Sequence, residues 1–480
     1  MTADISYLQN LQQPLEELQA LFDAQRAAYA ANPMPPAAQR QQWLKALKDL
    51  LNNERQALID AISQDFSHRS ADETLLAELM PSLHGIHYAS KHLKGWMRAS
   101  RRKVGAAFQP ASAKVVYQPL GVVGVIVPWN YPLYLAVGPL VGALSAGNRV
   151  MLKLSESTPA TGLLMKQLLA RIFPEDLVCV VLGEADIGVA FSRLPFDHLL
   201  FTGSTRVGTR VMKAASDHLV PVTLELGGKS AVIVHESYPM KRAAERVLTG
   251  KLYNAGQTCI APDYALVPAG DVDAWVRALV DAVGKLYPDP MRGDDYTSIV
   301  DTRHYERLVG LVDDARAHGA RIVTIPAGAA PDAVTRRIPP TLVVGATDAM
   351  RIMHEEIFGP LLPIEAYTTL DQAIAIVARR PRPLAFYVFG ADRAARARLL
   401  RETIAGGVTV DDTLWHFAHE ELPFGGVGAS GSGAYHGEAG FFTFSHRKSV
   451  FVQARFAAAK LLYPPYGRTF EKVLALLKRL

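Results

Sequence analysis

The first hundred residues alternate apolar and charged positions with the spacing of amphipathic helices. In the segment QRQQWLKALKDLLNNERQALIDAI, which begins at Gln39, apolar residues return every three or four positions and fall on one face of a helix. A helix of this kind buries its apolar face against another element. We therefore expect this region to cover a separate core, and the absence of a short repeat argues against a solenoid.

After about Val115 the pattern changes to short apolar strands that alternate with helices. GVVGVIV, RVMLKL, LVCVVL and HLLFTGS are typical of strands, and PLYLAVGPLVGALSAG and TPATGLLMKQLLARIF are typical of helices. Thr158, followed by Pro159, marks one helix start. This alternation predicts parallel strands with right-handed crossovers, and so a doubly wound α/β sheet.

A second series of alternating strands and helices begins at about Leu226 and predicts a second α/β domain. Its segments are SAVIV, AERVLTGKLYNAGQ, YALVP and DAWVRALVDAVGKLY.

Residues 115–148 carry no charged side chain, which raises the question of a membrane span. Pro119, Pro128, Pro132 and Pro139, together with several glycines, break this run into short pieces. The segment therefore predicts a buried strand, a loop and a buried helix, and we expect no membrane span.

The composition indicates a cytoplasmic protein. The N-terminal segment MTADISYLQNLQQPLEELQA has no basic start followed by an apolar block, so no secretory signal is expected. The two cysteines cannot form a disulfide framework, and no cysteine/histidine cluster has zinc spacing, so we expect no metal site. The net charge is +5 over 480 residues, and the lysines and arginines are dispersed, which argues against nucleic-acid binding.

The two cysteines lie in different surroundings. Cys179 belongs to the apolar run DLVCVVLG and is expected to be a small core residue of a strand. Cys259 lies in NAGQTCIAP, among small and polar neighbours that end in a turn. A reactive thiol needs partial exposure and a polar setting, so Cys259 is a candidate nucleophile.

The segment FTGSTRVG follows a predicted strand and opens a helix. Its glycines allow the backbone to approach a phosphate, and the start of the helix offers free N–H groups to an anion. Gly203, Ser204 and Gly208 are therefore candidates for binding the phosphates of a cofactor. The segment lacks the G-x-G-x-x-G pattern and is a weak signal by itself.

The chain contains an ordered set of motifs: VPWNYP, MLKLSESTP, FTGSTRVG, LELGGKS, NAGQTC and EEIFGP. This set resembles the NAD(P)-dependent aldehyde dehydrogenase superfamily. The resemblance runs from about Gln9 to the C-terminus. NAGQTCIAPDY and LPFGGVGASGSGAYHG are similar to the class 3 branch and, among bacterial members, to coniferyl aldehyde dehydrogenases. The resemblance implies that an aldehyde is oxidised to a carboxylate.

The resemblance also implies the catalytic roles. Cys259 attacks the aldehyde as a thiolate, and loss of hydride to the nicotinamide leaves a thioester that water must open. The side-chain amide of Asn130 and the backbone N–H of Cys259 stabilise the oxyanion. Glu225, at the end of the strand VTLEL, is the expected general base, while Glu356 is placed near the nicotinamide ribose with Phe358 against the ring. The choice between Glu225 and Glu356 stays open.

The cofactor preference rests on Lys153 and Glu156, at the end of a predicted strand and in the loop after it. The resemblance implies that both hold the adenosine ribose. A carboxylate there accepts hydrogen bonds from the ribose hydroxyls and repels a 2′-phosphate, which favours NAD. Lys153 offers the opposite charge, so NADP stays possible.

The resemblance implies a Rossmann-type cofactor domain, a second α/β catalytic domain and a small β bridging element that pairs strands across a homodimer. A short amphipathic helix is expected after Pro465, packed on the enzyme or on a partner subunit. The expected boundaries are 1–97 and 119–226 for the cofactor domain, 227–412 for the catalytic domain, 98–118 and 413–450 for the bridging element, and 451–480 for the tail.

Aromatic residues suggest the kind of aldehyde. Trp129 and Tyr131 flank Asn130, and the segment with Trp415, His416 and Phe417 is placed at the substrate entrance by the resemblance. Stacking against a conjugated aldehyde favours an aromatic substrate such as coniferyl aldehyde.

Other substrates and other functions stay open. A fatty or medium-chain aldehyde, a cofactor-independent thiol esterase and a non-catalytic paralogue are the alternatives. Two departures from the family pattern are Ala231, where many relatives have proline, and Asp411, where many have asparagine. The extra negative charge of Asp411 bears on the substrate preference.

Overall fold

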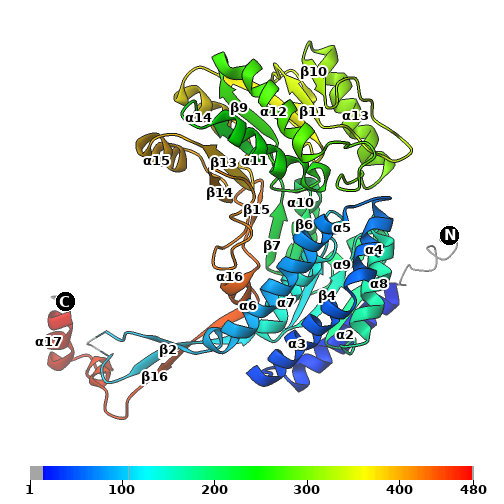
Figure 1. Ribbon diagram of the computed structural model, residues 1–480. Coiled ribbons are helices and arrows are strands. Elements are labelled where there is room, and N and C mark those ends of the chain that lie inside the picture. Colours follow the sequence, from blue (N-terminus) through cyan, green and yellow to red (C-terminus); the bar gives the residue numbers. More distant parts are fainter. Residues whose placement is uncertain (1–14, 106–107, 478–480) are drawn as a thin grey trace.

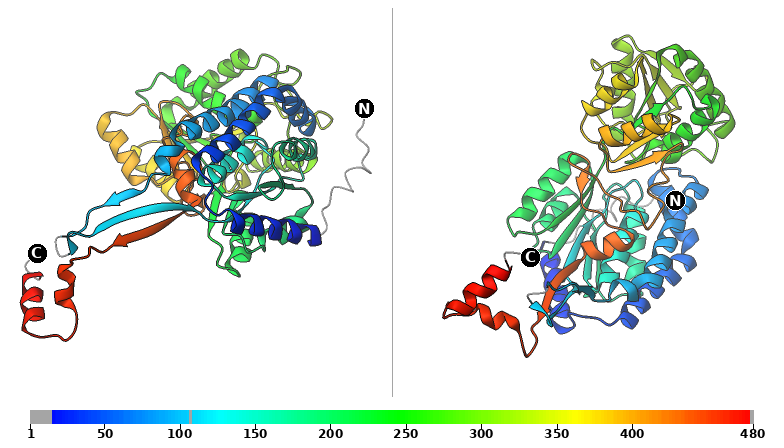
Figure 2. Two further views of the ribbon diagram at one scale, coloured as in Figure 1. Left: turned by 90° about the horizontal axis from the view of Figure 1, so that it is seen from below. Right: turned by 90° about the vertical axis from the view of Figure 1, so that its left-hand side faces the viewer.

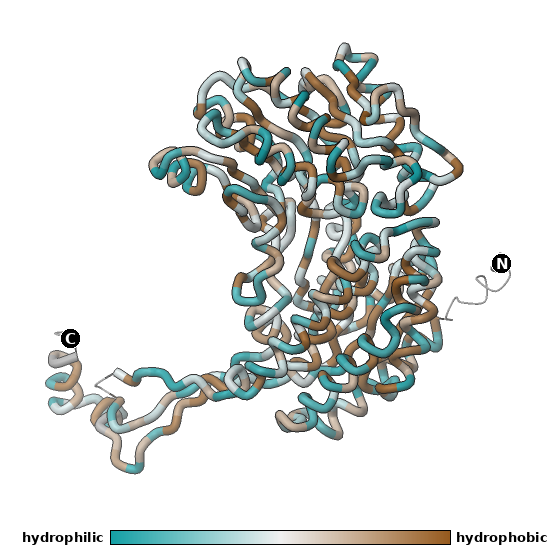
Figure 3. The backbone as a smooth tube through the Cα atoms, in the orientation of Figure 1, coloured by the Kyte–Doolittle hydropathy of each residue, from teal (hydrophilic) through white to brown (hydrophobic). Residues whose placement is uncertain are grey.

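A computed structural model describes residues 15–105 and 108–477, which form two large lobes and a projecting arm (Figures 1 and 2). Apolar stretches run through the interior of both lobes (Figure 3). Residues 1–14, 106–107 and 478–480 lie outside the description. They include part of the segment in which no secretory signal is expected and the end of the expected tail helix.

A six-stranded sheet forms the core of the first lobe. Its strand order is β15-β7-β6-β3-β4-β5, and every pair is parallel except β15 with β7. Side chains alternate between two cores: Val122 and Met151 pack on one face, and Val123 and Val150 on the other. The strands are β3 (Val122–Ile126), β4 (Arg149–Lys153), β5 (Val178–Val181), β6 (His198–Gly203), β7 (Val222–Leu226) and β15 (Gly431–Ser432).

Helices cover both faces of this sheet. α7 and α8 pack on one face beneath α3, α4 and α6, while α2, α9 and α10 pack on the other. α7 is apolar on all sides because it is enclosed between the sheet and the outer helices. The helices are α2 (Leu15–Ala31), α3 (Ala37–Asn53), α4 (Arg55–Asp65), α5 (Ala71–Thr74), η1 (Leu75–Leu79), α6 (Met80–Trp96), α7 (Tyr134–Ala146), α8 (Pro159–Ala170), α9 (Ala185–Ser192) and α10 (Thr205–Ser216).

A seven-stranded sheet forms the second lobe, in the order β10-β11-β12-β9-β8-β13-β14, with only β10 antiparallel to its neighbour. The strands are β8 (Ala231–Val234), β9 (Tyr264–Pro268), β10 (Arg321–Thr324), β11 (Thr341–Val344), β12 (Leu361–Tyr367), β13 (Ala385–Phe389) and β14 (Gly407–Val410). The helices are α11 (Met240–Leu252), η3 (Tyr253–Gly256), η4 (Ala269–Asp271), α12 (Val272–Leu286), α13 (Thr302–Ala317), η5 (Arg351–Met353), α14 (Leu370–Ala378) and α15 (Arg393–Glu402).

The chain crosses from the first lobe to the second directly after β7. That strand ends at Leu226 and β8 begins at Ala231, so residues 227–230 make the whole connection. The predicted doubly wound sheet and the second α/β unit are confirmed by these two sheets. The expected domain boundaries stay predictions.

The arm is a three-stranded antiparallel sheet in the order β1-β2-β16, followed by the C-terminal segment. The expected tail helix is present as α17, which contacts η6 and lies at the far end of the arm, away from both lobes (Figures 1 and 2). Its packing on a partner subunit stays a prediction. The elements of the arm are β1 (Ser100–Arg102), β2 (Ser112–Pro119), β16 (Ser445–Val452), η6 (Ala458–Leu462) and α17 (Arg468–Leu477). α16 (Gly437–Thr443) precedes β16 and packs on α6 and α7 of the first lobe (Figure 1).

Across the described parts of the chain, no helix has the length and apolar character needed to cross a membrane.

Candidate active site

Cys259 lies in the loop between η3 and β9, where the second lobe faces the first. Its side chain is half-buried, whereas Cys179 is fully buried in β5. Gln25 from α2 donates a hydrogen bond to the Cys179 sulfur at 3.6 Å, and burial raises the pKa of that thiol to about 12. Cys179 is therefore a core residue, and Cys259 is the thiol that a substrate could reach.

A left-handed turn leads into the Cys259 loop. Asn254, Ala255 and Gly256 have φ values of 52°, 50° and 77°, a conformation that costs energy for residues with a side chain. A Cβ on Gly256 would lie 2.3 Å from the carbonyl oxygen of Gly359, so only glycine fits there. The turn brings the loop close to the strand connection that follows Glu356.

Hydrogen bonds hold this turn in place. The backbone N–H of Asn254 donates to the carboxyl group of Glu73, 3.2 Å away. The side chain of Gln257 donates to the carbonyls of Asn254 and Ser298 at 3.0 and 3.1 Å and accepts from the N–H of Val300 at 3.0 Å. Glu73 also accepts a hydrogen bond from Thr297, 2.7 Å away. These bonds offset the strain of the turn.

Asn130, in the loop between β3 and α7, is buried against the same turn. Its side-chain amide donates to the carbonyl of Gln257 at 3.1 Å. Its own carbonyl accepts from the side chain of Asn254 at 3.0 Å and from Arg69 at 3.1 Å. The structure therefore brings Asn130 and the Cys259 loop together, as the sequence motifs suggested.

An ion pair that the sequence analysis missed lies behind Asn130. Arg69 and Glu78 are 2.6 Å apart, and both side chains are 0% exposed. Glu78 also accepts from the N–H groups of Leu133 and Tyr134 at 2.7 and 3.0 Å, at the start of α7. The pair thus fixes the loop that carries Asn130. No motif marked these residues, because their partners are backbone groups about 60 positions along the chain.

Glu225 lies near the end of β7 and is buried. Neither carboxyl oxygen has a hydrogen-bond partner among the described residues. Burial raises the pKa of this carboxyl well above its usual value, because charging it in an apolar setting is unfavourable. A base of this kind accepts a proton readily, which suits proton removal from a water molecule.

Glu356 belongs to the second lobe, and its carboxyl group lies against Gly227 in the connection between the lobes (residues 227–230). A Cβ on Gly227 would lie 2.0 Å from its Oε1, so the glycine makes room for this carboxyl group. Burial and the nearby Asp263 raise the pKa of Glu356, the N–H of Gly228 and the charges of nearby cations lower it, and the pKa that results is about 8.

The Cys259 thiol therefore lies near two carboxyl groups. Burial and the charges of Glu356 and Glu225 raise its pKa, the backbone N–H groups of Cys259 and Ile260 lower it, and the pKa that results is about 12. The same N–H groups point at the sulfur, and a nearby oxyanion would meet donors of the same kind.

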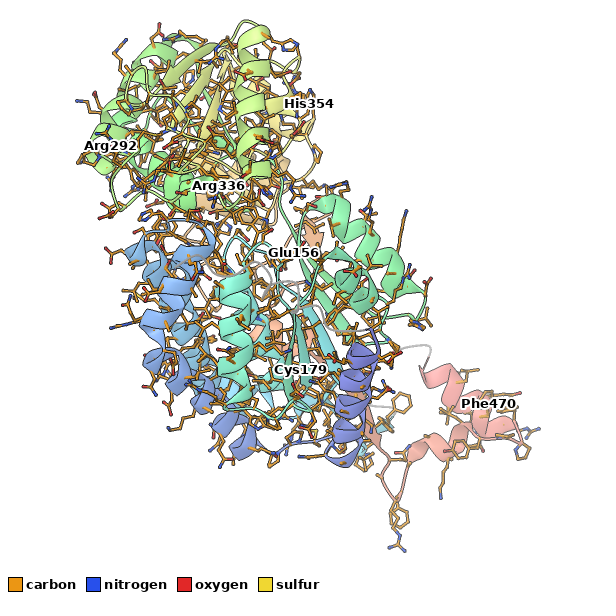
Figure 4. All side chains as sticks on the ribbon, turned by 90° about the vertical axis from the view of Figure 1, so that its right-hand side faces the viewer. Glu156, Cys179, Arg292, Arg336, His354 and Phe470 are labelled. Carbon is orange, nitrogen blue, oxygen red and sulfur yellow. The ribbon has the colours of Figure 1, made fainter. Side chains whose placement is uncertain are left out.

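The candidate cofactor residues lie at the carboxyl edge of the six-stranded sheet. Lys153 ends β4; it is buried, donates to the carbonyl of Leu154 at 2.7 Å and pairs with Glu156 at 3.7 Å. Glu156 is 44% exposed and lies at the edge that faces the second lobe (Figure 4). Ligands bind at this edge in open parallel sheets.

Gly203 and Ser204 lead into α10 at the same edge. Ser204 caps the helix by accepting from the N–H of Val207 at 3.4 Å. Gly208 has a packing role as well, because a Cβ there would lie 2.8 Å from Leu226. The exposed start of α10 can therefore receive a phosphate, and Gly208 lets the helix approach the sheet.

The aromatic residues that suggested an aromatic substrate have different packing partners, and their contact with the substrate stays a prediction. Trp129 packs edge to face on Phe358 at 5.3 Å. Tyr131 lies behind the Cys259 loop, where its hydroxyl bonds to Thr258 at 2.6 Å. Trp415 is exposed, and Phe417 packs on Tyr134 at 5.2 Å.

His416 and Asp411 have local partners. The His416 ring bonds to Thr409 at 2.8 Å. The Asp411 carboxylate accepts from the N–H of Gly390 at 2.8 Å and faces Arg396 at 3.4 Å, so its charge is compensated within the second lobe.

Within the described ranges, no group of three or more histidine, cysteine, aspartate or glutamate side chains is placed to hold a metal ion.

The model of the aldehyde dehydrogenase family matches residues 10–450, and the chain belongs to this family. It is 61% identical over 474 residues, 99% of each chain, to a Pseudomonas aeruginosa protein named "Probable coniferyl aldehyde dehydrogenase". It is 48% identical over 436 residues, 90% of each chain, to the coniferyl aldehyde dehydrogenase of Pseudomonas sp. strain HR199. The family and enzyme class expected from the motifs are confirmed.

Solved structures agree. The substrate-bound AldH of Staphylococcus aureus superposes with a TM-score of 0.92 and 38% identity, over 96% of this chain and 99% of that one. A Mycobacterium tuberculosis aldehyde dehydrogenase complexed with NAD+ gives a TM-score of 0.83 and 29% identity, over 92% and 91% of the two chains. The expected aldehyde dehydrogenase fold is confirmed.

Proposed function

We propose that this enzyme oxidises an aromatic aldehyde such as coniferyl aldehyde to its carboxylate with NAD+, through a thioester on Cys259. The observation that carries the proposal is the convergence of Cys259, Asn130 and Glu225, from both lobes, in the fold of this family. The two relatives named for coniferyl aldehyde support the substrate, and the high identity to one of them weighs most.

Cys259 forms the covalent bond to the substrate. Its sulfur attacks the aldehyde carbon, and the oxygen gains negative charge in the resulting thiohemiacetal. The side-chain amide of Asn130 and the backbone N–H of Cys259 stabilise this charge. The hydrogen bond from Asn130 to Gln257 uses one amide hydrogen, which leaves the second for the substrate oxygen.

The residues at the sheet edge fit a dinucleotide. Ser204 at the exposed start of α10 would receive the pyrophosphate, and Lys153 and Glu156 would bind the adenosine ribose. Glu356 and Phe358 would lie at the nicotinamide end. When bound, the cofactor supplies the hydride acceptor. The Glu156 carboxylate favours NAD+, and NADP+ is the alternative because Lys153 adjoins it.

Glu225 is the proposed base for thioester hydrolysis. It would take a proton from the attacking water, and its burial supports this role because the raised pKa strengthens the carboxylate as a base. The Glu356 carboxyl group interacts with the N–H of Gly228 and with nearby cations, next to the connection between the lobes. These interactions support a binding role for Glu356.

We also propose a cytoplasmic homodimer. β16 pairs with β2 along one edge, and no strand in the described residues pairs with its other edge. Phe451, Val452, Phe456 and Tyr463, on β16 and just after it, are exposed, which supports coverage by a partner subunit. The two cysteines are free thiols, which supports a reducing compartment.

One panel of aldehydes tests the proposed function. Coniferyl aldehyde, benzaldehyde, hexanal and decanal are compared with NAD+ and NADP+ by the absorbance of the reduced cofactor. We expect coniferyl aldehyde with NAD+ to give the highest kcat/KM. A tenfold preference for decanal would indicate a fatty-aldehyde enzyme. Ester hydrolysis without aldehyde oxidation would favour the thiol esterase.

A further inference from the structure

A buried carboxyl group of the first lobe binds the turn that leads to Cys259. Glu73, in α5, accepts a hydrogen bond from the backbone N–H of Asn254, 3.2 Å away, and one from the hydroxyl of Thr297, 2.7 Å away. Both donors belong to the second lobe: Asn254 opens the left-handed turn, and Thr297 lies in the loop before α13. Glu73 therefore connects the two lobes at the turn itself.

The turn needs a contact of this kind. Asn254 and Ala255 have φ values of 52° and 50°, and residues with a side chain keep this conformation only where the surrounding structure enforces it. Gln257 supports the turn from within the second lobe, by donating to the carbonyls of Asn254 and Ser298. Glu73 supports it from the first lobe, at the residue where the left-handed conformation begins.

Asn254 in turn contacts the segments that carry the two groups proposed to act on the aldehyde. Its side-chain amide donates to the carbonyls of Asn130 and Gln257 at 3.0 and 3.2 Å. Gln257 precedes Cys259 by two residues, and Asn130 is the proposed oxyanion donor. A displacement of Asn254 would therefore change the position of the thiol relative to the oxyanion donor.

The same helical segment carries a second anchoring carboxyl group. Glu78 lies five residues after Glu73, within the π turn η1 (Leu75–Leu79). Residues five apart point to different sides of an α-helix, whereas the i→i+5 bonds of a π turn bring them closer to one side. Glu78 accepts from the N–H groups at the start of α7, next to the loop of Asn130. One short segment of the first lobe thus holds the loops of both proposed catalytic groups.

These contacts depend on the position of the Glu73 carboxyl group rather than on its charge. The charges that raise the pKa of the Cys259 thiol are those of Glu356 and Glu225. Burial raises the pKa of Glu73 to about 7, so part of the molecules carry a proton there at neutral pH. A protonated carboxyl group keeps an oxygen that accepts from the backbone N–H, and the hydroxyl of Thr297 can turn to accept from its O–H.

We propose that Glu73 is a positioning residue, which holds Asn254 so that the Cys259 sulfur and the Asn130 amide reach the same aldehyde group. The proposal rests on the proposed role of Cys259 as the nucleophile. It requires a hydrogen-bond acceptor at the place of the Glu73 carboxyl group, whether or not that group is charged. An uncharged side chain of the same length therefore serves, and a shorter charged one does not.

Three variants separate position from charge. Glu73→Gln keeps the length and an oxygen acceptor without the charge, Glu73→Asp keeps the charge on a shorter side chain, and Glu73→Ala removes the group. The burst of reduced cofactor is followed by stopped-flow absorbance with NAD+ and coniferyl aldehyde. We expect its rate to stay within about threefold of the wild type in Glu73→Gln and to fall at least about tenfold in the other two, because misplaced reacting atoms slow the attack. The burst amplitude per enzyme and the KM for NAD+ should change little. Asp72→Asn, at an exposed neighbouring position, is the control.

A burst rate in Glu73→Asp equal to that of the wild type would overturn the proposal, even if Glu73→Ala fails to fold. A slower burst in Glu73→Gln than in Glu73→Asp would also overturn it, because the charge would then decide the rate. So would a loss of burst amplitude at an unchanged rate, since fewer folded molecules would explain that loss. Substantial oxidation by Cys259→Ala would instead contradict the proposed nucleophile, so the two failures are distinguishable.

Discussion

The side-chain amide of Asn130 donates a hydrogen bond to the backbone carbonyl of Gln257, 3.1 Å away and two residues before Cys259. Asn130 comes from the first lobe and Gln257 from the second, so the bond fixes the proposed oxyanion donor relative to the proposed nucleophile, Cys259. Arg69 and Asn254 hold the carbonyl of Asn130 from behind. The predictions below test what each part of this arrangement contributes.

Asn130→Ala should lower kcat by ~10²–10³, the usual loss for one oxyanion donor. The measurement is steady-state oxidation of coniferyl aldehyde. Asn52→Ala, an exposed helical asparagine, is the control and should leave kcat unchanged. A full rate in Asn130→Ala would exclude the donor role.

Cys259→Ala should abolish oxidation while NAD+ binding changes by a few-fold at most, because the thiol forms the covalent intermediate and does not hold the dinucleotide. Turnover and cofactor titration by fluorescence check both parts. Cys179→Ala should remain active and lose about 1 kcal/mol of stability in urea unfolding. Substantial oxidation by Cys259→Ala would refute the mechanism.

Glu225→Gln should still produce a burst of reduced cofactor and then stall, because the amide cannot take a proton from the hydrolytic water. Stopped-flow absorbance separates the burst from the steady state. Absence of the burst would place Glu225 before acylation. The parallel variant Glu356→Gln should not stall after a burst if Glu225 alone is the base.

Glu356→Gln should make the Cys259 thiol more acidic. The Glu356 carboxylate disfavours the thiolate, and it is charged above its own pKa of about 8. Removing this charge therefore lowers the pKa of the Cys259 thiol at pH values above the Glu356 pKa of about 8. Alkylation by iodoacetamide from pH 7 to 11, without cofactor, measures this as a shift of the rate curve to lower pH. Glu355→Gln is the neighbouring control, and an unshifted curve in Glu356→Gln would contradict the coupling.

Glu78→Ala should destabilise the fold by about 3–5 kcal/mol, because it leaves the Arg69 guanidinium buried without its partner. Urea unfolding followed by tryptophan fluorescence gives the free energy of unfolding. The double variant Arg69→Met with Glu78→Leu removes both charges and should be much less destabilised. Equal losses in the two proteins would show that packing, and not the unpaired charge, causes the effect.

The sequence predicted the residues whose positions follow from local pattern. Lys153 and Glu225 lie at the carboxyl ends of parallel strands. Such strand ends meet at one edge of the sheet, so the sequence was enough to predict that both residues lie at this edge. Arg69 and Glu78 could not, since their partners are backbone groups fixed by tertiary packing. Tyr131 and Tyr134 differ by three positions, yet only the fold decides that Tyr131 faces Thr258 and Tyr134 faces His436.

The surroundings of two loop aromatic residues and of Asp411 also depend on tertiary packing. Trp415 and Phe417 are two residues apart, yet Trp415 is exposed and Phe417 is half-buried against the core, because the loop turns between them. The Asp411 carboxylate contacts Arg396 and the N–H of Gly390, and the sequence indicated neither partner. The effect of Asp411 on the substrate preference stays a prediction. Long-range contacts of loops carry too little signal in one sequence to be predicted.

The four-residue crossing between β7 and β8 limits how the molecule can move. At about 3.3–3.6 Å per residue, residues 227–230 have a reach of only ~13–14 Å, and the Glu356 carboxyl lies against Gly227. The lobes therefore cannot draw apart at this point and can only swivel about it. Such a swivel would change the distance between Glu225, in the first lobe, and the Cys259 thiol, in the second, whereas Glu356 would move together with the thiol. The angle between the lobes would therefore set whether the proposed base and the proposed nucleophile act on the same water molecule.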